Sequence, residues 1–294
     1  MHGLRVDRAI HNYLYFTQYD RYVKWFLGAG RMVVRRMSRL PLLARAFQAV
    51  YDRYHAKVLA ESDAAKIFSL EKSLALGPEA AERVIPFPYA NRIILSEPDY
   101  IAIMDCPCRL ARENPCRPVN VCIAVGRTTA QFWLEHGEKY HARKATQQEA
   151  LELVRSERAR GHITTAWFKV ATGGRTGVIC SCCACCCGGL EAMRLVQQVK
   201  GGEKMSNLIP SGYAVETDPE KCAACGKCIE HCMFGAITPD QEGDPIYDRE
   251  ACYGCGLCVE LCENKAKTLA LDGKKGMPLD LEMLKEKEMK TNAG

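Results

Sequence analysis

Two hydrophobic periodicities divide the chain into regions of different structure. From Pro41 onward apolar side chains recur at intervals of three and four, which predicts a helix that continues to Val58. A second helical pattern follows and ends at Gly77-Pro78, a combination that stops helices. Residues 1–77 are therefore expected to form a mostly helical arm.

The next region mixes strand and helix signals. Short apolar runs predict strands at residues 92–95, 100–104, 119–125 and 162–170. A capping box from Thr146 to Glu149 predicts a helix that ends near Gly161, and another helix is expected over 190–200. After residue 270 the chain is rich in Lys and Glu. That composition predicts a short exposed helix or a disordered tail, with Leu279, Leu281 and Leu284 as its apolar residues.

Cysteine changes this picture, because the 18 cysteines among 294 residues fall in only three places, at 106–122, 180–187 and 222–262. A disulfide scaffold spreads its cysteines along a short secreted chain, whereas these are clustered in a chain long enough to bury a core. Metal or metal–sulfur binding is the remaining interpretation. The 48% hydrophobic and 26% charged content is ordinary, which excludes collagen, wholesale disorder and multispan membrane proteins.

Positive charge is concentrated at the start of the chain. Residues 1–60 hold 11 Lys and Arg against three Asp, and they contain 10 of the 23 aromatic residues. The start lacks the apolar core of a secretory signal, and no apolar run has the roughly 20 residues of a spanning helix. A cytoplasmic location is expected, with the inner face of the membrane as a peripheral alternative, because a basic aromatic helix also suits an anionic membrane surface.

The last cysteine group is an internal repeat. Two copies of the pattern C-x2-C-x2-C-x3-C lie 30 residues apart, at Cys222, Cys225, Cys228, Cys232 and at Cys252, Cys255, Cys258, Cys262. Residues 211–270 thereby resemble a bacterial ferredoxin with two [4Fe-4S] clusters. The resemblance implies one cluster on Cys222, Cys225, Cys228 and Cys262, and a second on Cys252, Cys255, Cys258 and Cys232.

One feature departs from that family. Met233 and Glu263 follow the fourth cysteines, where bacterial ferredoxins usually carry proline. This departure concerns the local turn and not the ligands. Zinc is the alternative occupant, but it prefers two separated cysteine pairs, and a third cysteine at the same interval exceeds that need.

The ten central cysteines form no repeat. They are Cys106, Cys108, Cys116, Cys122, Cys180, Cys182, Cys183, Cys185, Cys186 and Cys187, all candidate metal ligands. They suffice for one cubane with spares, for two cubanes with two thiols left over, or for one larger cluster, and a zinc-stabilised or merely cysteine-rich core is the alternative. Both groups follow predicted strands, so they are expected to converge at one edge of a sheet. His162 and His141 are further candidates as ligands or proton donors, although a structural role is the commoner one for a single histidine.

The whole arrangement is similar to larger multi-cluster ferredoxin-type electron-transfer proteins with a cysteine-rich central region. Cys186-Cys187-Gly188 also resembles one tripeptide of the heterodisulfide reductases. The expected fold class is α+β, with the helical arm at 1–77, a small cysteine-rich α/β domain at 78–205, a ferredoxin-like dicluster domain at 206–270 and a charged tail at 271–294.

These features predict an electron-transfer protein with two C-terminal [4Fe-4S] clusters and at least one further central cluster. The sequence contains no nucleotide loop, Rossmann fingerprint or catalytic triad, so no flavin or nicotinamide site is expected. The predicted partner is a redox protein docked through the basic arm, and nucleic acid is not expected. The alternative is a reductase whose central cluster or reactive thiols act on a substrate directly.

Overall fold

The computed structural model describes residues 17–37, 54–86, 93–169, 176–198 and 206–292. Its centre is a seven-stranded sheet in which every neighbouring pair is antiparallel except β1 and β9. In spatial order the strands are β6 (Arg143–Ala145), β4 (Ile101–Met104), β5 (Cys122–Val125), β8 (Thr176–Cys182), β7 (Ile163–Lys169), β1 (Tyr54–Leu59) and β9 (Leu208–Ile209).

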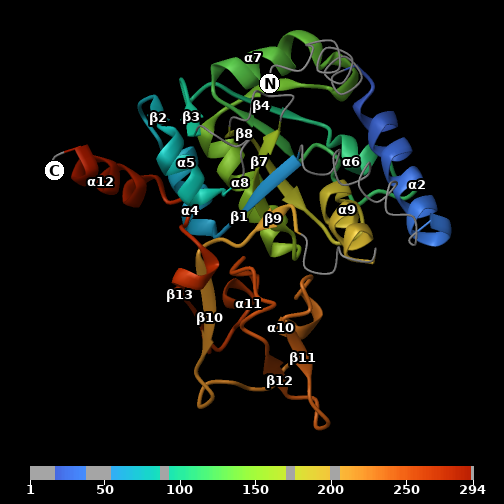
Figure 1. The fold of residues 1–294 in the computed structure, drawn as a ribbon, viewed down its shortest axis with the longest axis vertical. Helices are drawn as coiled ribbons and strands as arrows, with labels where there is room; N and C mark the ends of the chain where they lie inside the picture. Colours follow the sequence, from blue (N-terminus) through green and yellow to red (C-terminus); the bar gives the residue numbers. More distant parts are fainter. Residues whose placement is uncertain (1–16, 38–53, 87–92, 170–175, 199–205, 293–294) are drawn as a thin grey trace.

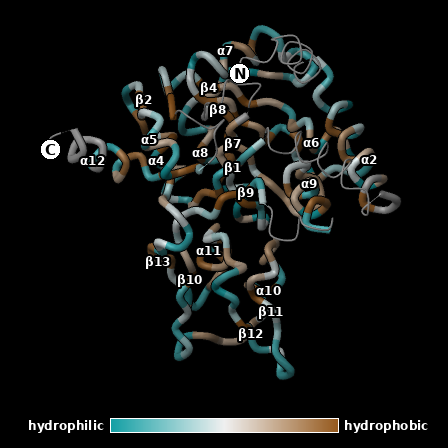
Figure 2. Tube along the Cα trace, viewed as in Figure 1, coloured by the Kyte–Doolittle hydropathy of each residue, from teal (hydrophilic) through white to brown (hydrophobic). Residues whose placement is uncertain are grey.

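Alternation along the strands gives the sheet two different faces. Successive side chains of a strand point to opposite sides, so Ile123 and Ile179 join one hydrophobic core while Cys122 and Cys182 join the other. The central strands are largely hydrophobic in Figure 2. All the cysteines of β5 and β8 therefore lie on one side of the sheet, which we call the thiol face.

Helices cover both faces of the sheet (Figure 1). The thiol face carries α2 (Tyr19–Met37), α6 (Pro107–Leu110), α7 (Arg127–His136) and α9 (Gly188–Gln197), with a 3-10 turn at Glu138–Tyr140. The opposite face carries α4 (Glu61–Phe68), α5 (Pro78–Val84), α8 (Gln147–Ala159), α12 (Leu281–Asn292) and the hairpin of β2 (Leu74–Leu76) and β3 (Ile93–Leu95). Thr146 caps α8, because its Oγ1 accepts a hydrogen bond from the Glu149 amide at 3.1 Å, whereas the Glu149 carboxylate pairs with Arg143 and does not complete the predicted capping box.

A separate lobe follows the sheet and projects below it in Figure 1. It is built from β10 (Tyr213–Thr217), α10 (Lys227–Glu230), β11 (Ile237–Pro239), β12 (Pro245–Tyr247), α11 (Leu257–Glu260) and β13 (Lys267–Leu271), and a 3-10 turn at Gly273–Lys275 follows. Two short helices begin at equivalent glycines, Gly226 and Gly256, with φ of 74° and 80°. Only glycine adopts that backbone cheaply, so these residues repeat for the same reason as the cysteines do.

The structure corrects two predictions at the ends of the chain. Tyr54–Leu59 were expected in a helix but form β1, because six residue pairs with β7 and the parallel contact with β9 outweigh the local pattern. Residues 54–76 thus contribute β1, α4 and β2 to the central body and not to an arm, while 1–16 and 38–53 lie outside the described residues.

The tail was expected to be exposed or disordered, and this was wrong for its first turn. Leu279, Leu281 and Leu284 are 0%, 2% and 1% exposed and join the core of the thiol-free face. Lys66 of α4 pairs with Asp280 at 2.7 Å and with Glu282 at 2.9 Å. Apolar burial and these ion pairs fix the start of α12 on α4. The fold class is mixed α/β with a C-terminal dicluster lobe, as predicted in outline.

Candidate metal centres

The second half of the repeat lies around a small cavity. Its lining includes four cysteines, Cys232, Cys252, Cys255 and Cys258, together with apolar side chains such as Phe234. Three of these cysteines come from the second copy and one from the first, which is the combination that the ferredoxin resemblance implies. The Gly254 amide donates to Cys252 Sγ at 3.3 Å. Four thiols, an apolar lining and an N–H directed at sulfur fit a [4Fe-4S] cluster.

The other predicted set comprises Cys222, Cys225, Cys228 and Cys262. Cys225 is exposed and the remaining three are half-buried. The Ala266 amide donates to Cys262 Sγ at 3.3 Å, the counterpart of the contact at Cys252. This half of the lobe is therefore more open to solvent than the half around Cys252.

Lys267 is a buried lysine that the sequence did not single out, and its charge acts on a cysteine of each half of the repeat. Lys267 is 5% exposed, and its ammonium donates to Thr217 Oγ1 at 2.8 Å. Burial raises the pKa of the Cys228 and Cys258 thiols, and the Lys267 charge opposes that rise at both. A Lys five residues after the last cysteine was the available signal, but only the fold shows that it is buried between the two sets.

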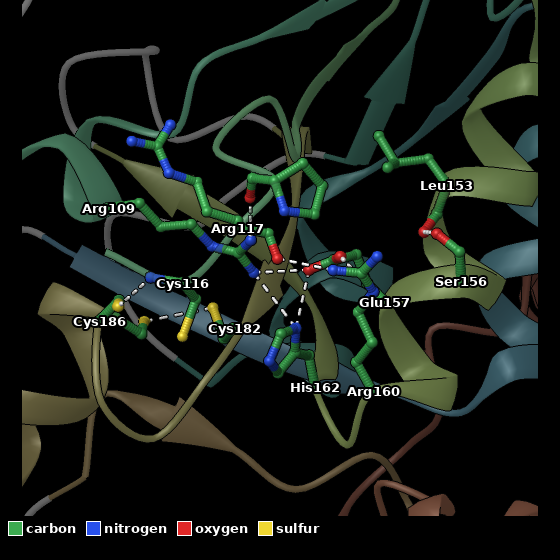
Figure 3. Close-up of polar contacts among 12 residues, drawn as sticks. Arg109, Cys116, Arg117, Leu153, Ser156, Glu157, Arg160, His162, Cys182 and Cys186 are labelled. Atoms are coloured by element: carbon green, nitrogen blue, oxygen red, sulfur yellow. Dashed lines mark hydrogen bonds and ion pairs between the residues drawn. The ribbon is translucent and has the colours of Figure 1, made fainter. Parts of the chain in front are cut away.

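The first central thiol group is compact, and we call it the four-thiol site. The Sγ atoms of Cys116, Cys183, Cys185 and Cys186 all lie within 4.8 Å of one another. Cys116 Sγ is 3.1 Å from Cys185 Sγ. The Cys116 amide donates to Cys186 Sγ at 3.4 Å (Figure 3). Three ligands come from a tight turn, in which the Cys187 amide donates to the Cys183 carbonyl. Four converging sulfurs can hold a metal ion or one cluster.

The remaining six cysteines lie on the thiol face, where three are buried and three are half-buried. Cys106 and Cys108 flank the start of α6, Cys122 and Cys180 pair across β5 and β8 with sulfurs 3.8 Å apart, and Cys182 Sγ is 3.2 Å from Cys187 Sγ. Because β4 and β8 run the same way and β5 opposes them, all six meet at one edge of the sheet, as predicted. Cys182 and Cys183 are adjacent in sequence but belong to different groups, in keeping with strand alternation.

Arginines fix the backbone that carries the four-thiol site. Arg112 donates to the Cys186 carbonyl from Nε at 3.1 Å and from a terminal nitrogen at 3.0 Å. Arg194 of α9 donates to the Ala184 carbonyl at 2.9 Å. Single arginines are common in proteins, so the sequence did not single out Arg112 and Arg194 as residues of this site. These contacts hold the loop in place without using the sulfur atoms.

The candidate histidines are held by carboxylates. His162 Nδ1 lies 2.7 Å from Glu157 Oε2, which also accepts a hydrogen bond from Arg109 at 2.6 Å (Figure 3). His141 Nδ1 lies 2.8 Å from Asp105 Oδ2. Each ring is therefore held by a carboxylate, and the exposed fraction of the His141 side chain is 80%.

Protonation controls how the thiols can bind metal. Burial and the thiols of Cys185 and Cys186 raise the pKa of Cys116 to about 11. Burial also raises that of Cys185, but hydrogen bonds from its three neighbours outweigh it and leave the Cys185 pKa below the ordinary thiol value. Metal ligation needs thiolates, and the lowered pKa of Cys185, which is exposed, favours the thiolate form of that sulfur.

Comparison with known proteins agrees with the geometry of the lobe. Residues 221–267 match the protein family described as the 4Fe-4S dicluster domain, and this segment contains all eight repeated cysteines. No curated protein matches the chain. The C-terminal lobe of this chain is therefore a 4Fe-4S dicluster domain.

Proposed function

We propose that this chain is an iron–sulfur electron-transfer protein in which the dicluster domain and the central thiols serve one relay to or from a redox partner. A [4Fe-4S] cluster held by four thiolates supplies one-electron chemistry, with a potential set by nearby charge, hydrogen bonds to sulfur and exposure. The residues of the chain hold the ligating segments close together and restrict their contact with water.

One observation carries the proposal. The guanidinium of Arg194 donates both to the Ala184 carbonyl, inside the four-thiol loop, and to the Met233 carbonyl at 3.4 Å, next to Cys232 of the dicluster domain. One side chain thus joins the backbones of two ligand-bearing segments. Short separation between redox centres favours transfer, and this bridge keeps the separation short.

Other contacts hold the side of the dicluster domain that contains Met233 against the central sheet. Arg158 of α8 donates to the Cys255 carbonyl at 2.5 Å and pairs with Glu260. Tyr253 stacks on Phe234 with ring centroids 4.2 Å apart, and both pack on the core of the thiol face. The set containing Cys255 is therefore the inner one, and the set containing exposed Cys225 is the outer one.

The exposed side of α2 fits an acidic partner. Arg21, Lys24, Trp25, Arg31 and Met32 recur at helical spacing on its solvent side, and Trp25 and Met32 are 70% and 55% exposed. Arg, Trp and Met are favoured in protein contacts, and the positive charge steers an acidic surface toward the helix. Among the described residues, no helix is long and apolar enough to cross a membrane.

The test uses the full chain purified without oxygen. Iron and sulfide are counted, and electron throughput is followed from a reduced ferredoxin to a soluble dye. Arg194→Ala should lower throughput severalfold at unchanged iron content, because it removes the bridge and no ligand. Arg83→Ala, which removes an exposed arginine on α5, is the matched control. Iron-free protein, or equal throughput in both variants, would overturn the proposal.

The same preparation tests the reductase alternative. For a relay, Cys185→Ser lowers throughput in proportion to the metal lost from the four-thiol site. For a reductase, the variant loses all turnover of a small disulfide or unsaturated acid while the dicluster signals persist. Wild-type protein without such turnover supports the relay.

A further inference from the structure

A cavity of about 90 Å³ lies under α2 on the thiol face. Its wall contains Arg109 and aromatic side chains of α2, Tyr22 and Phe26. Seven cysteines also line it: Cys106, Cys108, Cys180, Cys182 and Cys187, together with Cys183 and Cys186 of the neighbouring four-thiol site. A single water needs roughly 10–15 Å³, so the cavity is several times larger than a hydration site. Sulfur and aromatic carbon dominate the lining, a poor environment for water and a suitable one for a metal–sulfur cluster.

Four of the thiols converge from two segments. Cys106 and Cys108 lie on either side of Pro107 at the start of α6 and contact each other through their side chains. Cys182 and Cys187 end β8 and precede α9, with their sulfurs 3.2 Å apart. The segments meet at Gly188, where an added Cβ would lie 3.4 Å from Cys108 Sγ.

Position 189 beside this site has no room for a side chain, which requires glycine there. A Cβ at Gly189 would lie 2.1 Å from the Trp167 ring, far inside contact distance. The pair Gly188-Gly189 therefore lets the start of α9, with Cys187, approach both Cys108 and the cavity wall. This close approach has no use in an ordinary hydrophobic core, which larger side chains would fill better.

Arg109 gives the cavity a positive charge. It is 1% exposed and pairs with Glu157 at 2.6 Å, but its Nε is buried and has no hydrogen-bond partner among the described residues. A buried guanidinium N–H without an acceptor is costly. An anionic group in the cavity would supply the acceptor, and a cluster ligated by four thiolates carries negative charge on its sulfurs.

We infer that this cavity is a second central iron–sulfur site, which adjoins the four-thiol site but uses other ligands: Cys106, Cys108, Cys182 and Cys187 ligate a [4Fe-4S] cluster beside Arg109. Binding replaces four S–H bonds by four Fe–S bonds and releases four protons. The Cys122–Cys180 pair lies next to the site and is not among its ligands. The inference deepens the proposed function and rests on it, since it adds a centre to the same relay.

The experiment counts iron and sulfide in the anaerobic full chain and in single variants. Cys182→Ser and Cys187→Ser should each lose about four irons and four sulfides relative to the wild type, the content of one cubane. Cys185→Ser, which acts on the four-thiol site, should produce its own loss, and the Cys182→Ser, Cys185→Ser double variant should show the sum of the two. Electron paramagnetic resonance of the dicluster domain should be unchanged in all of them.

Cys122→Ser is the matched control, because it makes the same substitution on the same face of the sheet and should keep the wild-type iron content. Circular dichroism confirms that each variant is folded. Full iron content in folded Cys182→Ser and Cys187→Ser, or an equal loss in Cys122→Ser, would overturn the inference while the proposed function stands. Wild-type protein without iron would instead remove the proposed function.

Discussion

At the scale of single residues, buried and half-buried arginines join separate segments of this protein. Arg158 and Arg194 each donate to a backbone carbonyl close to a ligating cysteine, and Arg109 stands in the wall of the thiol cavity. Guanidinium groups are always charged and present several donors in a fixed plane, so one side chain can hold two segments. Replacing one of these arginines should therefore weaken the contact between the two segments that it joins.

Arg158→Ala should lower the free energy of unfolding by about 3 kcal/mol, near the low end for breaking a buried ion pair. The low end applies because Glu260 keeps 33% of its side chain exposed, whereas Arg158 is only 1% exposed. Urea unfolding without oxygen measures the change. Arg155→Ala on the same helix is the control: its partner is Glu61 and its side chain is 58% exposed, so we expect a loss of about 1 kcal/mol or less. Equal losses in the two variants would contradict the prediction.

Lys57 supplies a pH-dependent prediction. It is fully buried in β1, its Nζ has no hydrogen-bond partner among the described residues, and burial lowers its pKa from 10.5 to about 7, although Asp63 opposes the fall. Between these values the unfolded chain holds a proton that the native state lacks, so stability rises with pH. Below about pH 7 the destabilisation is complete and is on the order of 4 kcal/mol.

Lys57→Met should therefore stabilise the protein at pH 7, and the gain should shrink as pH rises toward 10.5. Melting temperatures of wild type and variant at pH 7 and pH 9.5 test this. A gain that is the same at both values would show that packing and not the buried charge is responsible.

At the scale of elements, the sequence predicts the helices and strands whose local hydrophobic and capping patterns agree with their burial in the structure. The strands at Ile101–Met104 and Cys122–Val125 and the capped helix at Gln147–Ala159 were predicted. β1 was not, because Tyr54 and Val58 lie four residues apart, a spacing that fits a helix and a two-residue period alike, and only pairing with a strand about 110 residues away decides between them.

The candidate sites show the same limit. Spacing predicted the repeated cysteines and the family that they indicate. The division of the ten central cysteines was beyond the sequence, since it depends on the turn from Cys183 to Cys187 and on Cys116 reaching that turn from a distant loop.

The docking of α12 yields a test at this scale. Leu279→Ala should lower the free energy of unfolding by about 2–5 kcal/mol, as for other fully buried leucines. Leu271→Ala is the control, because that side chain is 60% exposed at the end of β13 and should change stability by less than about 0.5 kcal/mol. If Leu279→Ala behaves like the control, the tail does not pack on α4 in solution.

At the scale of the whole molecule, the two faces of the sheet differ in composition: the central cysteines lie on one face, and a hydrophobic core without cysteine among the described residues covers the other. The core under α4, α5 and α8 contains no cysteine among the described residues, whereas the dicluster lobe has only a small core around Val215, Ala236 and Cys252. The sheet can therefore persist without metal, and the lobe depends on its clusters.

Removing iron with an anaerobic chelator should make the lobe sensitive to protease while the sheet stays folded. We expect cleavage within residues 211–270, retention of most of the circular dichroism, and a fragment that begins before α4 and ends near β9. Loss of all structure in one cooperative step would show that the sheet also needs the clusters.

The position of α2 also determines the order of assembly. This helix precedes α9 in the chain, and the surface that it covers is completed only by α9, whose residues follow about 150 positions later. Until α9 is made, the sulfur-lined cavity stays open to a donor of inorganic sulfide and iron. If the cavity takes up a cluster, α2 must therefore pack over it after the cluster is in place, and a chain that packs α2 earlier would fold without the cluster.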